Sequence, residues 1–205
     1  MTVTDIATTD TDAEHPFRRR LLDGLAESIA ERGYRETTIA DIVRHARTSK
    51  RTFYQEFNGK EECFIELLHT ANQEMIAQIN AAVDPEAFWQ EQVRQAIDAY
   101  VGAIEARPAV TLSWIRELPA LGAAVRSVQR QNIAELTEML AVITNNPGFR
   151  RASIPPATPQ LSVILLGGLR ELTALTVEDN KDVREIVDAA VAASIALVTA
   201  SLQDS

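Results

Sequence analysis

Two short stretches with the apolar spacing of helices follow one another in residues 37–57, TTIADIVRHARTSKRTFYQEF. Thr37 or Thr38 can cap the first stretch and Ser49 the second, because their hydroxyls accept hydrogen bonds from N–H groups of a first helical turn. Only two residues are left for the turn between them. Two short helices joined by so tight a turn have the shape of a helix-turn-helix. The inward-facing residues are Ile39, Ile42, Val43 and Ala46 in the first helix and Phe53 and Phe57 in the second.

The rest of the chain is expected to be helical as well. Its 205 residues are 46% hydrophobic, which suffices for one or two compact domains, and they include only 8 Gly and 8 Pro. Apolar residues at three- and four-residue steps, punctuated by Pro and Gly, predict an all-α fold of about nine helices. Helices are expected over about 16–32, 39–46, 49–57, 61–79, 85–104, 108–118, 121–143, 159–177 and 183–202, with a loop at NNPGFRRASIPPATP, residues 145–159.

Charge is distributed unevenly along the chain. The formal net charge is −9, yet residues 15–60 carry ten Lys or Arg against six Asp or Glu. Residues 1–14 and 61–205 are acidic. Such asymmetry suggests a polyanionic partner for the basic segment alone. We therefore expect a disordered tail over 1–14, a basic helix-turn-helix domain over 15–60 that can bind DNA, and a larger, acidic helical domain over 61–205.

The exposed side of the second short helix carries cations and hydroxyls. With its two Phe residues turned inward, Lys50, Arg51 and Tyr54 share the other side with Ser49. Cations and hydroxyls bind DNA phosphates, and Lys or Arg can reach guanine edges in the major groove. The alternative is a solvated basic face on an ordinary helical bundle. We favour DNA binding because the helix lengths, the turn, the caps and the charge asymmetry agree.

The stretch LAESIAERGYRETTIADIVRHARTSKRTFYQEFNGKEECF resembles the N-terminal DNA-binding domain of the TetR family of bacterial transcriptional repressors. It covers about the first quarter to third of the chain, and the remainder is similar to the family in helix count and layout. The matching positions are Gly33-Tyr34, Thr37-Thr38, Ala46, Ser49, Thr52-Phe53-Tyr54, and Phe57 with Lys60-Glu61.

The resemblance implies a homodimeric repressor that binds a palindromic double-stranded DNA operator and responds to a small-molecule ligand. It implies phosphate contacts for Thr38, Ser49, Thr52, Tyr54 and Lys60, and we expect base or near-base contacts from Lys50 and Arg51. Arg47 departs from the family pattern, because this turn position often holds Gly; Arg requires a negative φ there or accepts strain. The expected DNA-binding residues are Thr37, Thr38, Thr48, Ser49, Lys50, Arg51, Thr52, Tyr54 and Lys60.

A ligand pocket is expected in the larger domain, between the helices of residues 85–143 and the helix that contains Gly167-Gly168. Four apolar or aromatic residues follow one another at three- and four-residue steps on one helix, and a Trp lies near the break at Pro119. Few charges fall on this stripe, so the ligand should be small and mostly apolar, oriented by a Tyr hydroxyl or a Trp N–H. Plain core packing is the alternative for each residue. The candidates are Trp89, Val93, Ile97, Tyr100 and Trp114.

The two C-terminal segments, LSVILLGGLRELTAL and VDAAVAASIALVTASL, carry more apolar surface than one face of each helix needs. Their small residues permit close packing, and two such helices from each subunit would form a four-helix contact. The expected homodimer interface contains Leu165, Gly168, Leu169, Leu172, Val191, Ser194 and Leu197.

No pattern in the sequence predicts a catalytic site, a metal site or a cofactor. His15, His45 and His69 lie far apart, and Cys63 is expected to be a semi-buried side chain, with a redox-sensing thiol as the alternative. The N-terminus has no signal-peptide pattern, and charges interrupt the apolar stretches, so we expect a cytoplasmic protein without a membrane span. The main rival to a repressor is a helical small-molecule binding or carrier protein without a DNA-binding function. An enzyme is disfavoured because the sequence lacks a catalytic constellation.

Overall fold

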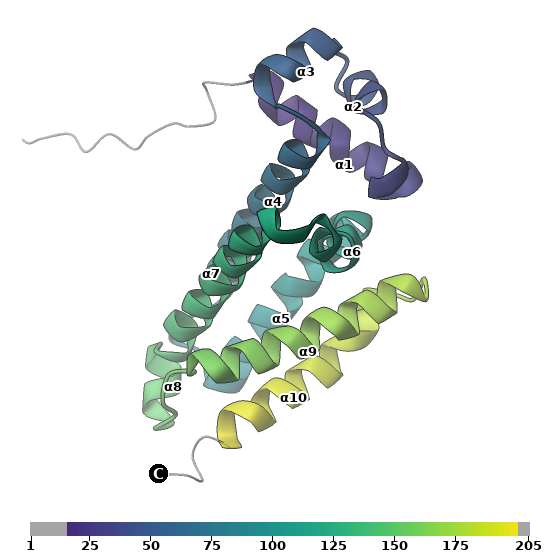
Figure 1. The fold of residues 1–205 in the computed structure, drawn as a ribbon. Helices are drawn as coiled ribbons and strands as arrows, with labels where there is room; N and C mark the ends of the chain where they lie inside the picture. Colours follow the sequence, from purple (N-terminus) through teal and green to yellow (C-terminus); the bar gives the residue numbers. More distant parts are fainter. Residues whose placement is uncertain (1–15, 201–205) are drawn as a thin grey trace, which may run out of the picture. The chain divides into compact units, whose positions relative to one another are not determined.

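The computed structural model describes residues 16–200, and this part of the chain is all helical, without a strand (Figure 1). The all-α expectation is confirmed; the expected tail over 1–14 and His15 lie outside the described residues. The chain divides into two compact units, up to Glu66 and from Leu67, with the division inside α4. The elements are α1 (Pro16–Glu36), α2 (Ile39–His45), α3 (Lys50–Glu56), α4 (Lys60–Ala82), α5 (Trp89–Ala106), α6 (Pro108–Arg116), η2 (Leu118–Val125), α7 (Arg126–Thr144), α8 (Pro147–Arg151), α9 (Pro159–Glu178), η3 (Val183–Ile186) and α10 (Val187–Ala200).

The first unit is a small three-helix domain completed by the start of α4. Its core consists of buried apolar side chains from α1, α2 and α3 together with Phe57 and Phe64. Gly24 brings the backbones of α1 and α2 into near contact, because a Cβ there would lie 2.7 Å from the carbonyl oxygen of Ile42 and 2.8 Å from the amide nitrogen of Ala46. The Tyr34 ring stacks on the Phe64 ring at a centroid distance of 3.9 Å, which packs the end of α1 against α4.

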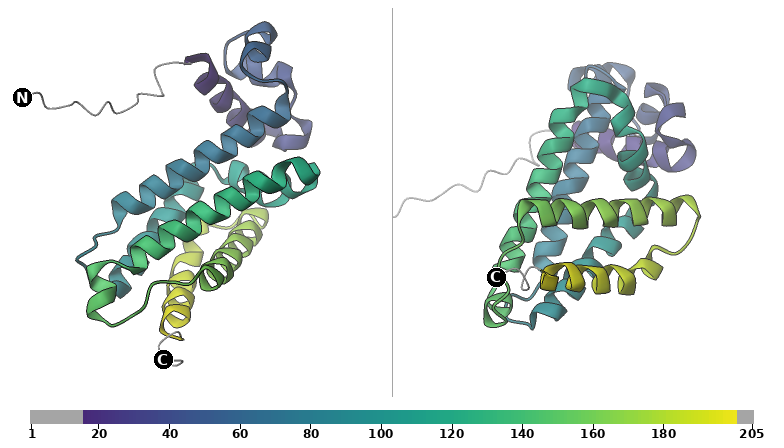
Figure 2. Two further views of the ribbon diagram at one scale, coloured as in Figure 1. Left: turned by 60° about the vertical axis from the view of Figure 1, so that its left-hand side comes forward. Right: turned by 60° about the horizontal axis from the view of Figure 1, so that its bottom comes forward.

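The second unit packs the remainder of α4 with α5 to α10. Helix α9 lies against α6 and α7, and α10 lies against α5 and alongside α9 (Figures 1 and 2). One buried apolar cluster joins side chains from α4, α5, α7, α9 and α10, as expected for helices that each turn one apolar side inward.

Three expectations for helices in this unit were wrong. Residues 147–151, expected in a loop, form the short helix α8. The pair Pro147-Gly148 is typical of a turn, but the burial of the Phe149 side chain stabilises the helix. The helix expected from residue 121 begins at Arg126, because Gly122, at φ 82°, interrupts the preceding η2. The helix expected from 85 begins at Trp89. The segment expected to be helical from 183 does begin there, as η3, and continues as α10 from Val187.

Helix α9 is the one helix in residues 16–200 with the length and hydropathy to cross a membrane, at a mean hydropathy of 1.3.

Candidate DNA-binding surface and ligand cavity

The recognition-type helix α3 is fixed by a cap at its start and by two buried rings. The hydroxyl oxygen of Ser49 accepts a hydrogen bond from the Thr52 amide at 3.1 Å, which satisfies one of the free N–H groups of the first turn. Phe53 and Phe57 are 0% and 2% exposed. With these rings inside, the same helix turns Tyr54 outward, with 59% of its surface exposed.

The turn between α2 and α3 is a Schellman motif with an arginine in the left-handed position. The Thr48 amide donates to the carbonyl oxygen of Val43 at 2.9 Å, and the Arg47 amide donates to that of Arg44 at 3.2 Å. Arg47 has φ 50°, so the strained alternative is the one adopted. The Arg20 guanidinium of α1 donates to the carbonyl oxygens of Ala46 and Arg47 at 2.6 and 2.9 Å and thereby ties the turn to α1.

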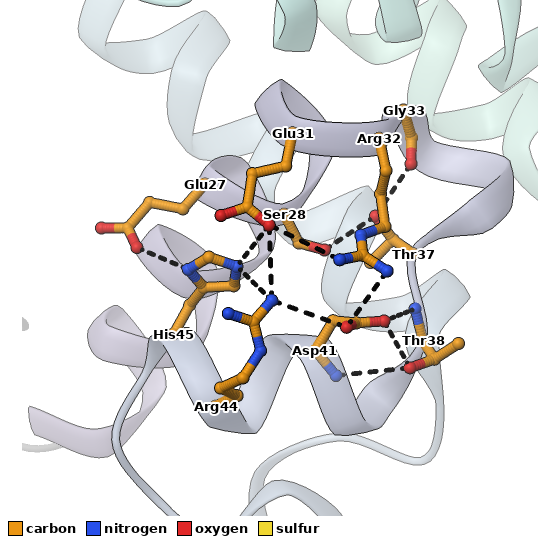
Figure 3. Close-up of polar contacts among 10 residues, drawn as sticks. All are labelled: Glu27, Ser28, Glu31, Arg32, Gly33, Thr37, Thr38, Asp41, Arg44 and His45. Carbon is orange, nitrogen blue, oxygen red and sulfur yellow. Dashed lines mark hydrogen bonds and ion pairs between the residues drawn. The ribbon is translucent and has the colours of Figure 1, made fainter.

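A polar network holds α2 against α1 (Figure 3). The His45 ring lies between two carboxylates of α1, with Nδ1 2.9 Å from Glu27 and Nε2 3.3 Å from Glu31. Arg44 pairs with Glu31 at 3.3 Å and with Asp41 at 3.6 Å. The pairs of His45 and Arg44 with Glu27 and Glu31 join the end of α2 to α1, so they help to fix α2 and, through the tight turn, α3.

The start of α2 is closed by a capping box. The Asp41 amide donates to the Thr38 hydroxyl oxygen at 3.3 Å, and the Thr38 amide donates to the Asp41 carboxylate at 3.1 Å. Hydrogen bonds from the Thr38 hydroxyl and amide hold the pKa of Asp41 below its usual range.

Cations of the first unit fall into two groups. Arg18, which pairs with Glu66, and Arg44 are engaged by carboxylates, and Arg20 by carbonyl oxygens. By contrast, within residues 16–200 no carboxylate pairs with the three exposed cations at the turn and the start of α3, which are Arg47, Lys50 and Arg51. Positive charge without a protein partner is therefore concentrated where α3 begins, which suits a phosphate-rich partner.

The structure separates the expected DNA-binding residues into accessible and inaccessible ones. Thr37 is 1% exposed, and its hydroxyl donates to the carbonyl oxygen of Gly33 at 2.8 Å, so it acts inside the unit. The Lys60 ammonium donates to the carbonyl oxygens of Tyr34, Arg35 and Thr37 at 3.0, 3.2 and 2.7 Å, so a phosphate contact would have to replace one of these bonds. The others are exposed or half-buried, namely Thr38, Thr48, Ser49, Lys50, Arg51, Thr52 and Tyr54.

Gln55 is an exposed residue of α3 that the sequence analysis did not single out. It lies four positions after Arg51, on a helix whose apolar positions are already occupied by Phe53 and Phe57. That spacing could have identified it, because a Gln side chain can pair with the edge of adenine in the major groove.

The second unit contains a cavity of about 440 Å³. Its wall comes from α4, α5, α6, α7 and α9 and is mostly apolar. The volume falls within the range of about 300–1,000 Å³ that small-molecule sites occupy. Its charged wall residues are Glu74, Arg107 and Arg170.

Two of the five expected ligand-binding residues, Tyr100 and Trp114, line this cavity. Val93 and Ile97 are buried in the core, and the Trp89 ring packs near Phe149 at a centroid distance of 5.9 Å. The apolar stripe of α5 thus packs against α8 and the core at its N-terminal end, and it lines the cavity at its C-terminal end. Arg170 also lines the cavity and is not among the expected ligand-binding residues.

The expected dimer residues are also divided. Leu169, Val191 and Ser194 are 8%, 6% and 2% exposed, so their side chains lie inside the unit. Leu165, Leu172 and Leu197 are half-buried, and Gly168 is exposed. The outer side of α9 and α10 instead presents Ile164, Gly168, Leu175, Ala192, Ala193 and Ala196.

Cys63 is fully buried, and burial raises the pKa of its thiol to about 12. The sulfur is therefore kept as an unreactive thiol, which weighs against redox sensing at this residue. In residues 16–200 no group of three His, Cys, Asp or Glu side chains is placed to hold a metal ion.

Comparison with known proteins matches residues 21–67 to the model of the bacterial regulatory proteins of the tetR family. The uncharacterized HTH-type transcriptional regulator YhgD of Bacillus subtilis is 24% identical over 151 residues, which cover 73% of this chain and 78% of YhgD. The fold is similar to that of the regulator FadR from Bacillus subtilis, solved in complex with stearoyl-CoA, with a TM-score of 0.74, 18% identity and coverage of 88% and 97% of the two chains. FadR from Bacillus halodurans gives a TM-score of 0.70 at 19% identity, over 86% of this chain and 93% of that one.

Proposed function

Because the chain belongs to the TetR family of bacterial transcriptional regulators, we propose that it is a ligand-responsive repressor that binds a palindromic DNA operator as a homodimer. The first unit binds the DNA, and the second binds a small molecule and dimerises. Its site of action is the cytoplasm, and its role is regulation of transcription rather than catalysis.

The observation that carries this proposal is the group of exposed cations at Arg47, Lys50 and Arg51, which have no carboxylate partner within residues 16–200. They lie at the start of a capped helix whose opposite side is buried by Phe53 and Phe57. Arg18, Arg20 and Arg44 bind carboxylates or carbonyl oxygens of the same unit. The charges of Arg47, Lys50 and Arg51 are therefore the ones available to phosphates and base edges.

Selection from randomised DNA tests the DNA-binding part. We expect a palindrome to be enriched, with Lys50→Ala or Arg51→Ala costing about 1–3 kcal/mol if the residue contacts a base. Tyr54→Phe should weaken binding to all sequences alike, because phosphates carry no sequence information. Lys181→Ala is the control, since Lys181 pairs with Asp179 in the other unit. No enrichment of a palindrome would overturn the repressor proposal.

We place the dimer contact on the outer side of α9 and α10. Ile164 and Leu175 are 61% and 51% exposed. The exposed positions between and beside them are Gly or Ala, except for Glu171, which pairs with Arg116, and Val163. Such a surface can approach its own copy closely about a two-fold axis. A Cβ at Gly168 would meet nothing within 4 Å, so Gly168→Glu leaves the protomer undisturbed and should yield monomers in sedimentation. Val142→Glu, at a 59% exposed position of α7, should leave the dimer intact; a monomeric wild-type protein at micromolar concentration contradicts this model.

Coupling between the sites is proposed to run along α4. This helix begins at Lys60 in the DNA-binding unit, and its residues Ala71 and Met75 line the cavity. A ligand that displaces α4 would change the spacing of the two recognition helices, provided that it binds the two states with different affinity. A ligand that fills the cavity but leaves operator affinity unchanged at saturation would refute the coupling.

The second candidate function is a small-molecule carrier without DNA binding, which the cavity alone would equally support. DNA affinity that falls steeply with salt separates the two, because phosphate contacts release counterions.

A further inference from the structure

Among the described residues, the wall of the cavity in the second unit has one charged side chain that forms no ion pair. Of its three charged wall residues, Glu74 and Arg107 form an ion pair at 3.8 Å. Arg170 is half-buried, and within the described residues no carboxylate pairs with it. Its one hydrogen bond found there runs to the carbonyl oxygen of Ile115, at 2.8 Å.

The carboxylates nearest to Arg170 in the chain form their ion pairs with another arginine, Arg116. The adjacent Glu171 and the nearby Glu178 are both bound by Arg116, at 2.9 and 2.6 Å. Burial and the charge of Arg116 lower the pKa of Arg170, and the charge of Glu171 offsets part of that effect. A guanidinium in an apolar wall is costly without a partner, and it retains N–H donors that match a planar carboxylate.

A hydroxyl donor lies beside this charge. Tyr100 and Arg170 both line the cavity, and Thr173, the hydrogen-bond partner of Tyr100, lies three positions after Arg170 on α9. Burial raises the pKa of the Tyr100 hydroxyl, and the hydrogen bond to Thr173 and the charge of Arg170 lower it in part. The Tyr100 hydroxyl, which stays protonated, lies 2.8 Å from the Thr173 hydroxyl. Beyond this pair the wall is dominated by apolar side chains such as Ile104, Trp114 and Leu166.

We infer that the cavity takes an organic acid with one carboxylate and an apolar body. The carboxylate lies against the guanidinium of Arg170 with the Tyr100 hydroxyl beside it, and the apolar body lies along the rest of the wall. This inference rests on the proposal that the cavity is the effector site, and it narrows the class of effector from any apolar molecule to an amphipathic acid.

Binding of decanoic acid and decan-1-ol to the full-length protein, measured by calorimetry, tests this inference. We expect the wild-type protein to bind decanoate at least about tenfold tighter than the alcohol, because a charge-assisted hydrogen bond is lost in the alcohol. Arg170→Gln should abolish that preference by weakening decanoate alone. Arg94→Gln removes the same charge from an exposed pair with Asp188 and should keep the preference.

Tyr100→Phe provides a second variant, because it removes only a hydroxyl; a several-fold loss for decanoate and none for decanol is expected. Decanoyl-CoA, which has no free carboxylate on its chain, separates a free acid from a thioester. Equal affinity for acid and alcohol, no decanoate binding, a preference that survives in Arg170→Gln, or binding of decanoyl-CoA in place of decanoate would each overturn the inference. DNA binding measured on the same preparation distinguishes failure of this inference from failure of the repressor proposal. DNA binding without decanoate binding refutes the ligand class alone. Absence of DNA binding refutes the repressor proposal.

Discussion

Replacing Arg47 by glycine should stabilise the protein, although it removes a charged side chain from an exposed turn. Arg47 occupies the left-handed position of the Schellman motif at φ 50°. That conformation costs a residue with a Cβ about 1–2 kcal/mol. Glycine removes this cost but adds about 0.4–1 kcal/mol of entropy to the unfolded state. The net expectation for Arg47→Gly is a gain of about 1 kcal/mol, or about 2–4 °C in melting temperature for a chain of this size.

Two matched variants separate the backbone effect from the loss of charge. Arg47→Ala removes the same guanidinium but keeps the Cβ, so it should give no gain. Asn180 has φ 54° in an equivalent motif after α9, and Asn tolerates this region, so Asn180→Gly should gain less than Arg47→Gly. Thermal melts at one protein concentration measure all three variants.

The reasoning is refuted if Arg47→Ala is as stable as Arg47→Gly, because the left-handed strain would then be absent. Operator binding provides a second, independent readout. If the Arg47 side chain contacts a phosphate, both variants should lower the slope of log affinity against log salt by about 0.9. Stability and DNA affinity should thus move in opposite directions in Arg47→Gly.

Three further predictions concern the first unit. Cys63, with its thiol pKa raised to about 12 by burial, should not react with a thiol-specific disulfide reagent at pH 8 until the protein is unfolded; fast reaction of the folded protein would contradict the burial. Asp41 has a lowered pKa, so its contribution is present above its unfolded pKa of about 3.9 and is lost as the pH falls through the folded value; Asp41→Asn should therefore lower the melting temperature at pH 7 and reduce the acid-side decline below about pH 4. Gly24→Ala should cost about 1–3 kcal/mol in denaturant unfolding, because its Cβ meets backbone at 2.7 Å, whereas Gly102→Ala, in the open interior of α5, should gain up to about 1 kcal/mol; equal effects would show that α1 and α2 can move apart.

The helix-turn-helix could be predicted closely from the sequence. The caps of Thr38 and Ser49, the burial of Phe53 and Phe57 and the exposure of Tyr54 all appear where their spacing indicated. These features depend on residues three or four positions apart, because hydrogen bonds and side-chain contacts of a single helix act over that distance. The all-α class followed from the same local periodicity.

Other roles could not be predicted, because they depend on residues far apart in the chain. The spacing on α5 marks an apolar stripe, but tertiary packing decides that Trp89 lies against Phe149 of α8 while Tyr100 lines the cavity. Lys60 was expected to contact DNA from the family resemblance. In the fold its ammonium donates hydrogen bonds to carbonyl oxygens of residues 34–37, which lie more than twenty positions earlier in the chain.

The uncompensated charge of Arg170 arises in the same way. In the sequence it stands beside Glu171, which would be read as its partner. In the fold Arg116, more than fifty residues earlier, takes that carboxylate. The periodicity of a sequence shows which side of a helix is apolar. The residue that each side chain contacts is set by the packing of the whole unit. A charged side chain can pair only with an opposite charge that the tertiary structure brings close to it.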